Sequence, residues 1–505
     1  MAVDLKYTSC DSIPGLVQEL RQSFSMGLTK DVSFRKQQLR NLQRFCEEHT
    51  EAIQKALYAD LRKHTIETGV GEISLVVEEC RYMIKNLDRL VKPTSTKKRF
   101  LMNAMDKTYI RKEPKGVVAV LGAWNYPVNL LLMPVVGAIA AGCCVVIKPS
   151  EVAANTAELM GRLLPQYLDK RTYTVVNGAI PETTTLLEQK LDHIFYTGNG
   201  AVGKIVMTAA AKHLTPVTLE LGGKSPAIVA PDADFNITAH RLLWGKFYNC
   251  GQTCVAPDYV MVDKDQMERL IVAFRRTIRE YYTDNPQKSN SYGRIINTRQ
   301  FDRLKRLLDA CDPSSIVVGG DTDRDDLYIS PTIVSNVQPN DGNLMADEIF
   351  GPILPIVPVK DMKEAIQVVN SRDHPLALYV FTSSARTYNE ILDQTNSGGA
   401  LVNDTLMHLQ ELSLPFGGVG PSGMGSYHGD KSFDTFTHER STMIKSTHFE
   451  SLIAAKYPPY TVDKETVMNL LVYGLPSSIA GKVQTVVRAC SATFRILFGK
   501  QQPTA

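Results

Sequence analysis

Three side chains of this sequence could together make and break a covalent bond at a carbonyl carbon. Cys254 is a thiol among small and polar residues (positions 249–257), and a thiolate there could act as a nucleophile. Glu220 precedes two glycines and could activate a water molecule. The amide of Asn125 could stabilise an oxyanion. A single cysteine is more often a buried structural residue, so this prediction depends on the three occurring together.

Two further motifs have the residue types of a dinucleotide-binding site. Residues 198–203 match G-x-G-x-x-G, which is a weak signal alone. They lie between an apolar strand and a predicted helix (202–212) whose N-terminus could face a pyrophosphate. Lys148 and Glu151 follow another apolar strand, and nucleotides bind at the carboxyl ends of parallel strands. The residues of the glycine motif are Gly198, Asn199, Gly200, Ala201, Val202 and Gly203.

The elements that must position these residues alternate between helices and strands. Helical periodicity extends from about residue 11 to residue 90. An apolar strand at 116–122, a helix at 130–141 and a strand at 144–147 form a βαβ unit, which requires a parallel sheet. The pattern therefore predicts an α/β, doubly wound, Rossmann-like domain. Later strands of the same pattern are expected at 174–176 and 193–196.

A second α/β region is expected to begin near Thr218. Its predicted strands are 227–229 and 259–262, and its predicted helices are 265–281 and 297–310. A chain of 505 residues is too long for one ordinary core, which agrees with two or more domains.

Composition argues against several classes of protein. The net charge of +3, from 56 basic and 53 acidic side chains, gives no nucleic-acid signature. Nine cysteines at irregular spacings argue against a disulfide framework, and none has zinc-ligand spacing, so no metal is expected. The first residues lack the apolar core of a signal peptide, which favours an intracellular, reducing compartment.

These motifs, in this order, resemble the aldehyde dehydrogenase family, and most closely its class 3 branch, which includes the fatty aldehyde dehydrogenases. The resemblance implies a Rossmann-like NAD-binding domain, an α/β catalytic domain and a small oligomerisation arm. It also implies that the chain returns to the first domain near Leu401. The runs that carry it, beyond those above, are 124–127, 147–151, 195–203, 219–226, 348–352 and 414–429. The domains expected are 1–217 for the N-terminal helices and NAD(P) binding, 218–404 for catalysis, 405–450 for the return segment and arm, and 451–505 for a C-terminal tail.

The resemblance also assigns roles to residues. Cys254 would form a thiohemiacetal and then a thioester, with the alkoxide stabilised by Asn125 and the backbone N–H of Cys254. Glu220 would activate the water that releases the acid, and acylating relatives that use coenzyme A generally lack this carboxylate. The adenosine ribose of NAD or NADP would contact Lys148 and Glu151. The nicotinamide end would contact Glu348 and Phe350. Cys250 departs from the family pattern: it could share a helical face with Cys254 and form a resting disulfide, or it could simply fill space.

The C-terminal tail carries a basic, amphipathic pattern. Lys482, Arg488 and Arg495 interrupt its apolar run, so no membrane-spanning segment is expected. Such a helix can lie in a membrane interface, cap the substrate tunnel of a partner subunit, or dock on its own core, and the sequence leaves these open. The apolar residues at helical spacing after Pro476 are Ile479, Val483, Val486, Cys490, Phe494 and Leu497.

The function expected is NAD(P)-dependent oxidation of aldehydes to carboxylic acids, with medium- or long-chain apolar (fatty) aldehydes as substrates. The alternatives are a class 3 enzyme for aromatic or apocarotenoid aldehydes and a non-catalytic binding protein on the same fold. The expected partners are an aldehyde and a second copy of the chain, with peripheral membrane contact through the tail and no nucleic acid. The expected location is the cytoplasm or the cytosolic face of an internal membrane.

Overall fold

The chain divides into two units of unequal size. The computed structural model describes residues 5–448, 450 and 454–498. The larger unit comprises residues 1–90 and 114–437, and the smaller comprises residues 91–113 and 438–505. Every motif proposed above to carry chemistry therefore falls within the larger unit.

The larger unit begins with helices, as the periodicity of residues 11–90 predicts. Asp31 caps the second helix by accepting a hydrogen bond from Ser33 N–H. A single π-helical turn, Gly69–Ile73, interrupts the series before the last helix. The α-helices are α1 (Ile13–Ser25), α2 (Val32–Glu48), α3 (Thr50–Leu61), α4 (Thr65–Thr68) and α5 (Ser74–Leu90).

A six-stranded sheet follows, in the order β17-β7-β6-β3-β4-β5. The strands β3 to β7 pair in parallel, and antiparallel β17 forms one edge. Side chains on one face of β3 and β4 pack with α1, α8 and α9 in one apolar core, while α6 contacts the same two strands. The strands are β3 (Val117–Leu121), β4 (Cys144–Lys148), β5 (Tyr173–Val175), β6 (His193–Thr197), β7 (Val217–Glu220) and β17 (Gly423–Met424), and the helices are α6 (Asn129–Ala141), α7 (Ala154–Tyr167), α8 (Ile180–Leu187) and α9 (Gly200–Ala211).

This sheet is doubly wound, which confirms the predicted fold class. The chain passes from β3 to β4 and β5 on one side, and then to β6 and β7 on the other side of β3. Parallel strands place their carboxyl ends at one edge, so Lys148, Thr197 and Glu220 end at the same edge of the sheet.

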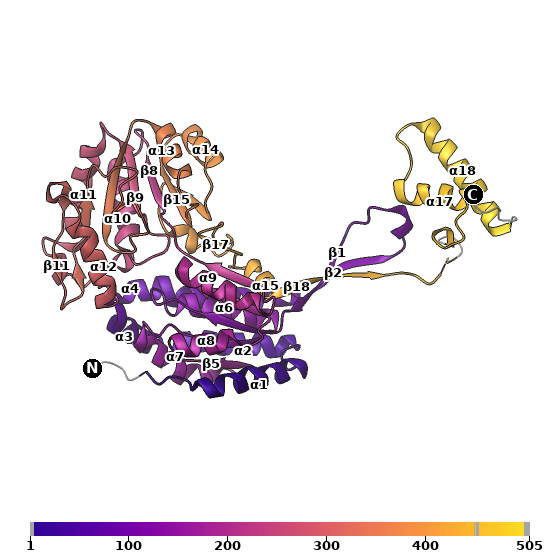
Figure 1. The fold of residues 1–505 in the computed structure, drawn as a ribbon, viewed down its shortest axis with the longest axis horizontal. Coiled ribbons are helices and arrows are strands. Elements are labelled where there is room, and N and C mark those ends of the chain that lie inside the picture. The colour runs from indigo at the N-terminus through magenta and orange to yellow at the C-terminus, as the bar shows by residue number, and fades with distance from the viewer. Residues whose placement is uncertain (1–4, 449, 451–453, 499–505) are drawn as a thin grey trace. The chain divides into compact units, whose positions relative to one another are not determined.

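The second sheet has seven strands in the order β10-β13-β14-β9-β8-β15-β16, parallel except for β10. Helices α10 to α14 surround it (Figure 1). Its strands are β8 (Pro226–Val229), β9 (Tyr259–Asp263), β10 (Ile316–Val318), β13 (Thr332–Val334), β14 (Ile353–Val359), β15 (Ala377–Phe381) and β16 (Gly399–Val402). The helices are α10 (Phe235–Phe247), α11 (Met267–Tyr282), α12 (Thr298–Asp309), α13 (Met362–Asn370) and α14 (Ala385–Gln394). The strands β11 (Thr322–Asp323) and β12 (Tyr328–Ile329) form a separate pair.

The chain returns to the first sheet later than the resemblance implies. Leu401 pairs with Tyr379 and is still part of the seven-stranded sheet. The chain rejoins the six-stranded sheet at β17, where Gly423 pairs with Glu220, and then forms α15 (Asp430–Thr435). The segment between β16 and β17 therefore connects the two sheets.

The smaller unit contains a three-stranded sheet and two tail helices. The sheet has the order β1-β2-β18, formed by β1 (Thr94–Ser95), β2 (Lys107–Pro114) and β18 (Thr437–Ile444). Helix α17 (Val462–Tyr473) packs on α18 (Ile479–Phe498) through a small core that contains Val467 and Ala492. Among the helices that the structure describes, none is long and apolar enough to cross a bilayer.

Candidate active site

Cys254 lies in an irregular loop between α10 and β9. The preceding turn, Tyr248–Gly251, contains two non-glycine residues in the left-handed region, Asn249 (φ 51°) and Cys250 (φ 56°). This break means that Cys250 and Cys254 do not share a helical face, so that suggestion from the sequence is wrong. Both thiols are free, and Cys250 is fully buried.

Hydrogen bonds hold this loop on both sides of the thiol. The Gln252 side chain donates to Arg294 O (2.9 Å) and accepts from Ile296 N–H (3.0 Å). The Tyr379 hydroxyl donates to Val255 O at 2.6 Å. Because the residues two before and one after Cys254 are tied to other segments, the backbone at the nucleophile is fixed before a substrate arrives.

Asn125 lies against the same loop. Its side-chain amide is 4% exposed and donates to Gln252 O at 3.1 Å. Asn249 in turn donates from its side chain to Asn125 O at 2.9 Å and to Gln252 O at 3.0 Å. The structure therefore places the Asn125 amide against the loop that carries the thiol, because its partner Gln252 lies two residues before Cys254.

Glu220 ends β7 with a buried carboxyl group. The residue is 2% exposed, and within the part of the chain that the structure describes neither carboxyl oxygen has a hydrogen-bond partner. Burial alone raises the pKa of Glu220 well above its ordinary value. A carboxyl group that is desolvated and unpaired destabilises the fold, which is typical of a group kept for chemistry.

The environment of Cys254 raises the pKa of the thiol. Burial is the largest cause, and the carboxyl groups of Glu348 and Glu220 add to it. The three residues are thus close enough to act on one another electrostatically. A raised pKa disfavours the thiolate, so forming the nucleophile requires a group that takes the proton.

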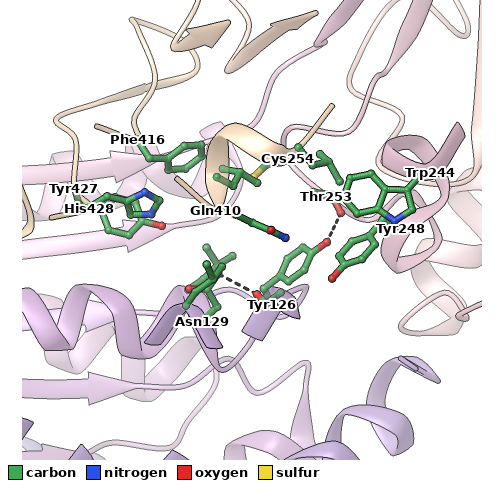
Figure 2. A pocket seen from close by; sticks show the side chains of 15 residues that line it. Tyr126, Asn129, Trp244, Tyr248, Thr253, Cys254, Gln410, Phe416, Tyr427 and His428 are labelled. Carbon is green, nitrogen blue, oxygen red and sulfur yellow. Dashed lines mark hydrogen bonds between the residues drawn. The ribbon is translucent and has the colours of Figure 1, made fainter. Parts of the chain in front are cut away.

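A largely apolar pocket opens onto the thiol. Leucine and aromatic side chains make up most of its lining, as is usual in small-molecule sites. Figure 2 shows Cys254 and Thr253 facing a space bordered by aromatic rings on both sides. Tyr126 and Thr253 are joined by a hydrogen bond of 2.7 Å between their hydroxyl groups. The lining residues are Gly71, Leu75, Tyr126, Asn129, Leu130, Trp244, Tyr248, Thr253, Cys254, Leu406, Leu409, Gln410, Phe416, Tyr427 and His428.

The residues expected to bind the adenosine ribose lie at the carboxyl end of β4. Lys148 is 5% exposed, and its ammonium group donates to Pro149 O at 3.1 Å and to the Glu151 carboxylate at 3.2 Å. The pair is therefore not a solvated surface pair but a partly buried one at the edge where nucleotides bind in doubly wound sheets.

The glycine motif surrounds the start of α9. Asn199 caps this helix by accepting a hydrogen bond from Val202 N–H at 3.0 Å. At Gly200 a Cβ atom would meet no other atom within 4 Å, so the helix N-terminus is open to a ligand. At Gly203 a Cβ atom would lie 3.0 Å from Leu221 Cδ2, so this glycine lets the helix pack closely on the sheet.

Glu348 and Phe350 lie on a segment anchored beneath the site. Ile349 N–H donates to both carboxylate oxygens of Asp258 at 3.2 Å. A Cβ atom on Gly222 would lie 2.1 Å from Glu348 Oε2, so only glycine admits this carboxylate. Phe350 has a φ of 49°, and its ring meets Trp124 edge-on at 5.4 Å between centroids.

These observations fit a dinucleotide. The edge of the six-stranded sheet offers an open helix N-terminus for phosphates, a Lys148–Glu151 pair for a ribose, and the buried hydroxyl of Thr197, which has no partner among the described residues. Glu348, whose pKa burial raises to about 8, supplies a further carboxyl group close to Cys254. No group of described residues could hold a metal ion.

The sequence predicted Cys254 as a nucleophile but did not predict which residues form the walls of the pocket that it faces. Tyr126, Phe416, Tyr427 and His428 belong to the runs that carry the family resemblance, although nothing in their spacing indicated that they face one space. Of the aromatic pocket residues named above, two lie outside those runs, on the last turn of α10 and just after it. They are Trp244 and Tyr248, four positions apart on the approach to Cys254.

Comparison with known proteins agrees with this arrangement. The family model described as "Aldehyde dehydrogenase family" matches residues 17–442. Aldehyde dehydrogenase family 3 member A2 of Rattus norvegicus is 46% identical over 486 residues, covering 96% of this chain and 99% of that protein. The dimeric NADP-preferring aldehyde dehydrogenase of Rattus norvegicus is 47% identical, covering 89% and 98%.

A solved structure, described as the substrate-bound state of Staphylococcus aureus AldH, superimposes with a TM-score of 0.86. It is 42% identical, and the match covers 89% of this chain and 97% of that one. The family and fold expected from the sequence are confirmed. The chain belongs to the aldehyde dehydrogenase family, in its class 3 branch, and is an NAD(P)-dependent enzyme that oxidises aldehydes to carboxylic acids.

Proposed function

We propose that Cys254 is the nucleophile of this reaction. Its thiolate attacks the aldehyde carbon and forms a thiohemiacetal whose oxygen carries the negative charge. The Asn125 amide and the backbone N–H of Cys254 stabilise that oxygen, and removing one such donor typically lowers turnover by about 10²–10³-fold. When bound, NAD(P) supplies the acceptor for the hydride whose loss turns the adduct into a thioester.

Glu220 then acts as the base that activates water for hydrolysis of the thioester. Its carboxyl group is buried and unpaired among the described residues, so a water molecule that enters finds a free acceptor. This assignment favours release of a carboxylic acid over transfer to coenzyme A.

The observation that carries this proposal is the position of Cys254 in the pocket wall, within the electrostatic reach of Glu220. Cys254→Ser should lower aldehyde oxidation at least about 10³-fold and leave the Kd for NAD nearly unchanged. Cys250→Ser is the matched control and should remain active. Turnover of more than about 1% in Cys254→Ser would contradict the assignment.

For the cofactor we propose that Lys148 and Glu151 bind the adenosine ribose and that residues 198–203 face the pyrophosphate. Glu348 and Phe350 contact the nicotinamide end. The Lys148 ammonium group offsets the charge of Glu151, which supports use of both NAD and NADP. Lys148→Met should therefore weaken NADP binding more than NAD binding, as measured by titrating each dinucleotide. Equal loss for both would contradict this role of Lys148.

The preferred substrates are medium- or long-chain apolar aldehydes. Leucine and aromatic side chains dominate the lining and suit an aliphatic chain. The rings of Tyr126, Trp244, Tyr248 and Phe416 equally favour a second candidate, aromatic or apocarotenoid aldehydes. A panel of aldehydes of increasing length, with aromatic members, separates the two: kcat/KM should rise with chain length for fatty substrates.

The domain boundaries of 217/218 and 404/405 stay proposals, as does assembly into a homodimer. A relative with 47% identity is named as dimeric. Sedimentation analysis should give about twice the chain mass of 56.0 kDa. A single species at the chain mass would contradict the dimer.

We further propose that α18 makes peripheral contact with membranes. The apolar stripe predicted from the sequence is exposed: Ile479 is 81% and Phe494 65% accessible. From residue 451 onward the sequence has six basic and two acidic residues, so anionic lipid would attract it. All nine cysteines are free, which agrees with a reducing compartment such as the cytoplasm or the cytosolic face of an internal membrane.

A further inference from the structure

A buried ion pair lies next to the segment that carries Asn125. Lys63 follows α3, and Glu72 belongs to the π-helical turn Gly69–Ile73. Both side chains are completely buried, and the ammonium nitrogen is 2.6 Å from Glu72 Oε1. Single π turns within helices occur frequently at functional sites. Neither residue has a part in the chemistry described above.

The hydrogen bonds of the pair all reach residues 125–129. Lys63 donates to Asn125 O at 2.9 Å, and its ammonium group lies 4.0 Å from the centre of the Tyr126 ring. Glu72 Oε2 accepts from Val128 N–H at 3.1 Å and from Asn129 N–H at 2.9 Å. The remaining residue of the segment, a proline at 127, has no N–H to donate.

Three residues of this segment form part of the candidate site. Asn125 points its amide at Gln252 O beside the thiol, and its own carbonyl accepts from both Lys63 and Asn249. Tyr126 and Asn129 line the substrate pocket. Neither Lys63 nor Glu72 is among the residues that line the pocket, so the pair contacts the segment without bordering the substrate space.

Stability alone is a weak reason for such a pair. Desolvating two charges costs as much as their attraction returns, and well-packed neutral residues often serve the fold equally well. Glu72 lies at the start of α6, where it binds Val128 and Asn129. A second buried charge, Arg35, lies at the other end of α6 and donates to Ala140 O at 3.2 Å and to Thr29 O at 2.6 Å. The two ends of α6 are about 20 Å apart. Arg35 and Glu72 are therefore both buried charges that bind one end of this helix, but only Glu72 binds the end that adjoins Asn125.

We propose that Lys63 and Glu72 are positioning residues that hold the backbone of residues 125–129, and thereby the Asn125 amide, in register with Cys254. This inference rests on the proposed role of Asn125 as an oxyanion donor. A displacement of the order of 1 Å in such a donor lowers the rate by about 10²-fold. The pair therefore controls hydride transfer without touching the substrate.

The test compares three variants of the full-length enzyme: Glu72→Gln, Lys63→Met and the double variant. Each single variant should lower Tm because one buried charge loses its partner, and the double variant should regain most of that loss. The rate of the first-turnover burst of NADH should nevertheless stay about 10–10²-fold below wild type in the double variant. The Kd for NAD should stay within about twofold. Recovery of both Tm and burst rate would overturn the proposal, because the pair would then serve folding alone.

Arg35→Met is the matched control. It removes a buried charge at the other end of α6, so Tm should fall while the burst rate stays at the wild-type value. If the double variant does not fold, Glu72→Gln gives the same test on its own, because it preserves the shape of the side chain. A wild-type burst rate in Glu72→Gln with a lowered Tm would also overturn the proposal.

A cycle with Asn125→Ala separates this inference from the proposed function. In the Asn125→Ala background, adding Glu72→Gln should change the burst rate less than about threefold, since the donor that the pair positions is already gone. If Glu72→Gln instead lowers the burst rate by the same factor with and without Asn125→Ala, Glu72 does not act through Asn125. A wild-type burst in Asn125→Ala alone would instead refute the oxyanion role, whatever the Glu72 variants do.

Discussion

At Glu220, the free-energy cost of burying an unpaired carboxyl group is set against its proposed role as a base. Its carboxyl group is 2% exposed and has no hydrogen-bond partner among the described residues. Burial raises its pKa, so the folded enzyme binds its proton more tightly than the unfolded chain does. The stability that depends on this proton is present below the unfolded pKa and is lost as pH rises toward the folded pKa.

Glu220→Gln should therefore stabilise the fold at neutral pH, by about 1–3 kcal/mol, because a buried group that can ionise is replaced by a neutral one. The difference in Tm between variant and wild type should grow as pH rises above about 4.5. Thermal unfolding across this pH range measures it. A Tm difference that does not change with pH would mean that Glu220 finds a partner in solution.

The same variant tests the order of the two chemical steps. Glu220→Gln should release one equivalent of NADH and then stop, leaving an acyl group on Cys254 that mass spectrometry detects. In the wild type, hydrolysis should become faster as pH rises, because only the ionised carboxylate accepts a proton from water. Absence of a trapped thioester in Glu220→Gln would show that Glu220 acts earlier, on the thiol.

At the scale of elements, the turn before Cys254 depends on one glycine. Gly251 has a φ of 74°, and a Cβ atom there would lie 2.3 Å from Gly351 O. Gly251→Ala should destabilise the enzyme by about 2–4 kcal/mol through left-handed strain and overpacking. It should also weaken dinucleotide binding, because the segment displaced carries Phe350. Chemical denaturation and NAD titration measure the two effects.

Gly15→Ala is the control for this prediction. Gly15 lies in α1, and a Cβ atom there would meet nothing within 4 Å. Alanine in a helix should stabilise the fold by about 0.5–1 kcal/mol. If Gly251→Ala behaves like Gly15→Ala, the turn relaxes more easily than its contacts indicate.

The elements themselves were largely predictable because local patterns determine them. The strands 116–122 and 144–147 are continuous apolar runs, and the structure places β3 and β4 within one residue of those limits. The strand β7 was not predicted, since residues 217–220 resemble the start of a glycine turn. Contacts between distant segments could not be predicted either: nothing in the sequence near Lys63 indicates that it donates a hydrogen bond to Asn125. Likewise, Asn249 and Cys250 adopt left-handed backbone conformations although neither is a glycine, so their residue types do not predict the turn after α10.

At the scale of the whole molecule, the tail distinguishes this chain from a simple two-sheet enzyme. The buried residues of α18 are small, Ala489 and Ala492, and most of its larger apolar side chains are exposed, although Ile496 packs in the small core. A stripe of this kind needs an apolar partner outside its own unit. A membrane surface and a partner subunit are the two partners to test.

Val483→Glu combined with Phe494→Glu should reduce binding to anionic liposomes at least about tenfold, because both side chains belong to the exposed stripe. Oxidation of short, soluble aldehydes should not change. Ile180→Glu is the control, since Ile180 is 79% exposed on the larger unit. Binding should weaken with salt. If the double variant binds liposomes normally but dissociates in sedimentation analysis, the stripe contacts a partner subunit instead.

The segment between β16 and β17 has a consequence for evolution. It connects the two sheets and supplies Leu406, Leu409, Gln410 and Phe416 to the pocket, yet none of these residues belongs to a strand of either sheet. The proposed nucleophile and the proposed cofactor contacts lie elsewhere in the chain. Selection can therefore alter this one stretch and change which aldehydes are accepted while the catalytic machinery is inherited unchanged. Divergence of substrate range among related enzymes would then be concentrated in a single short exchangeable module.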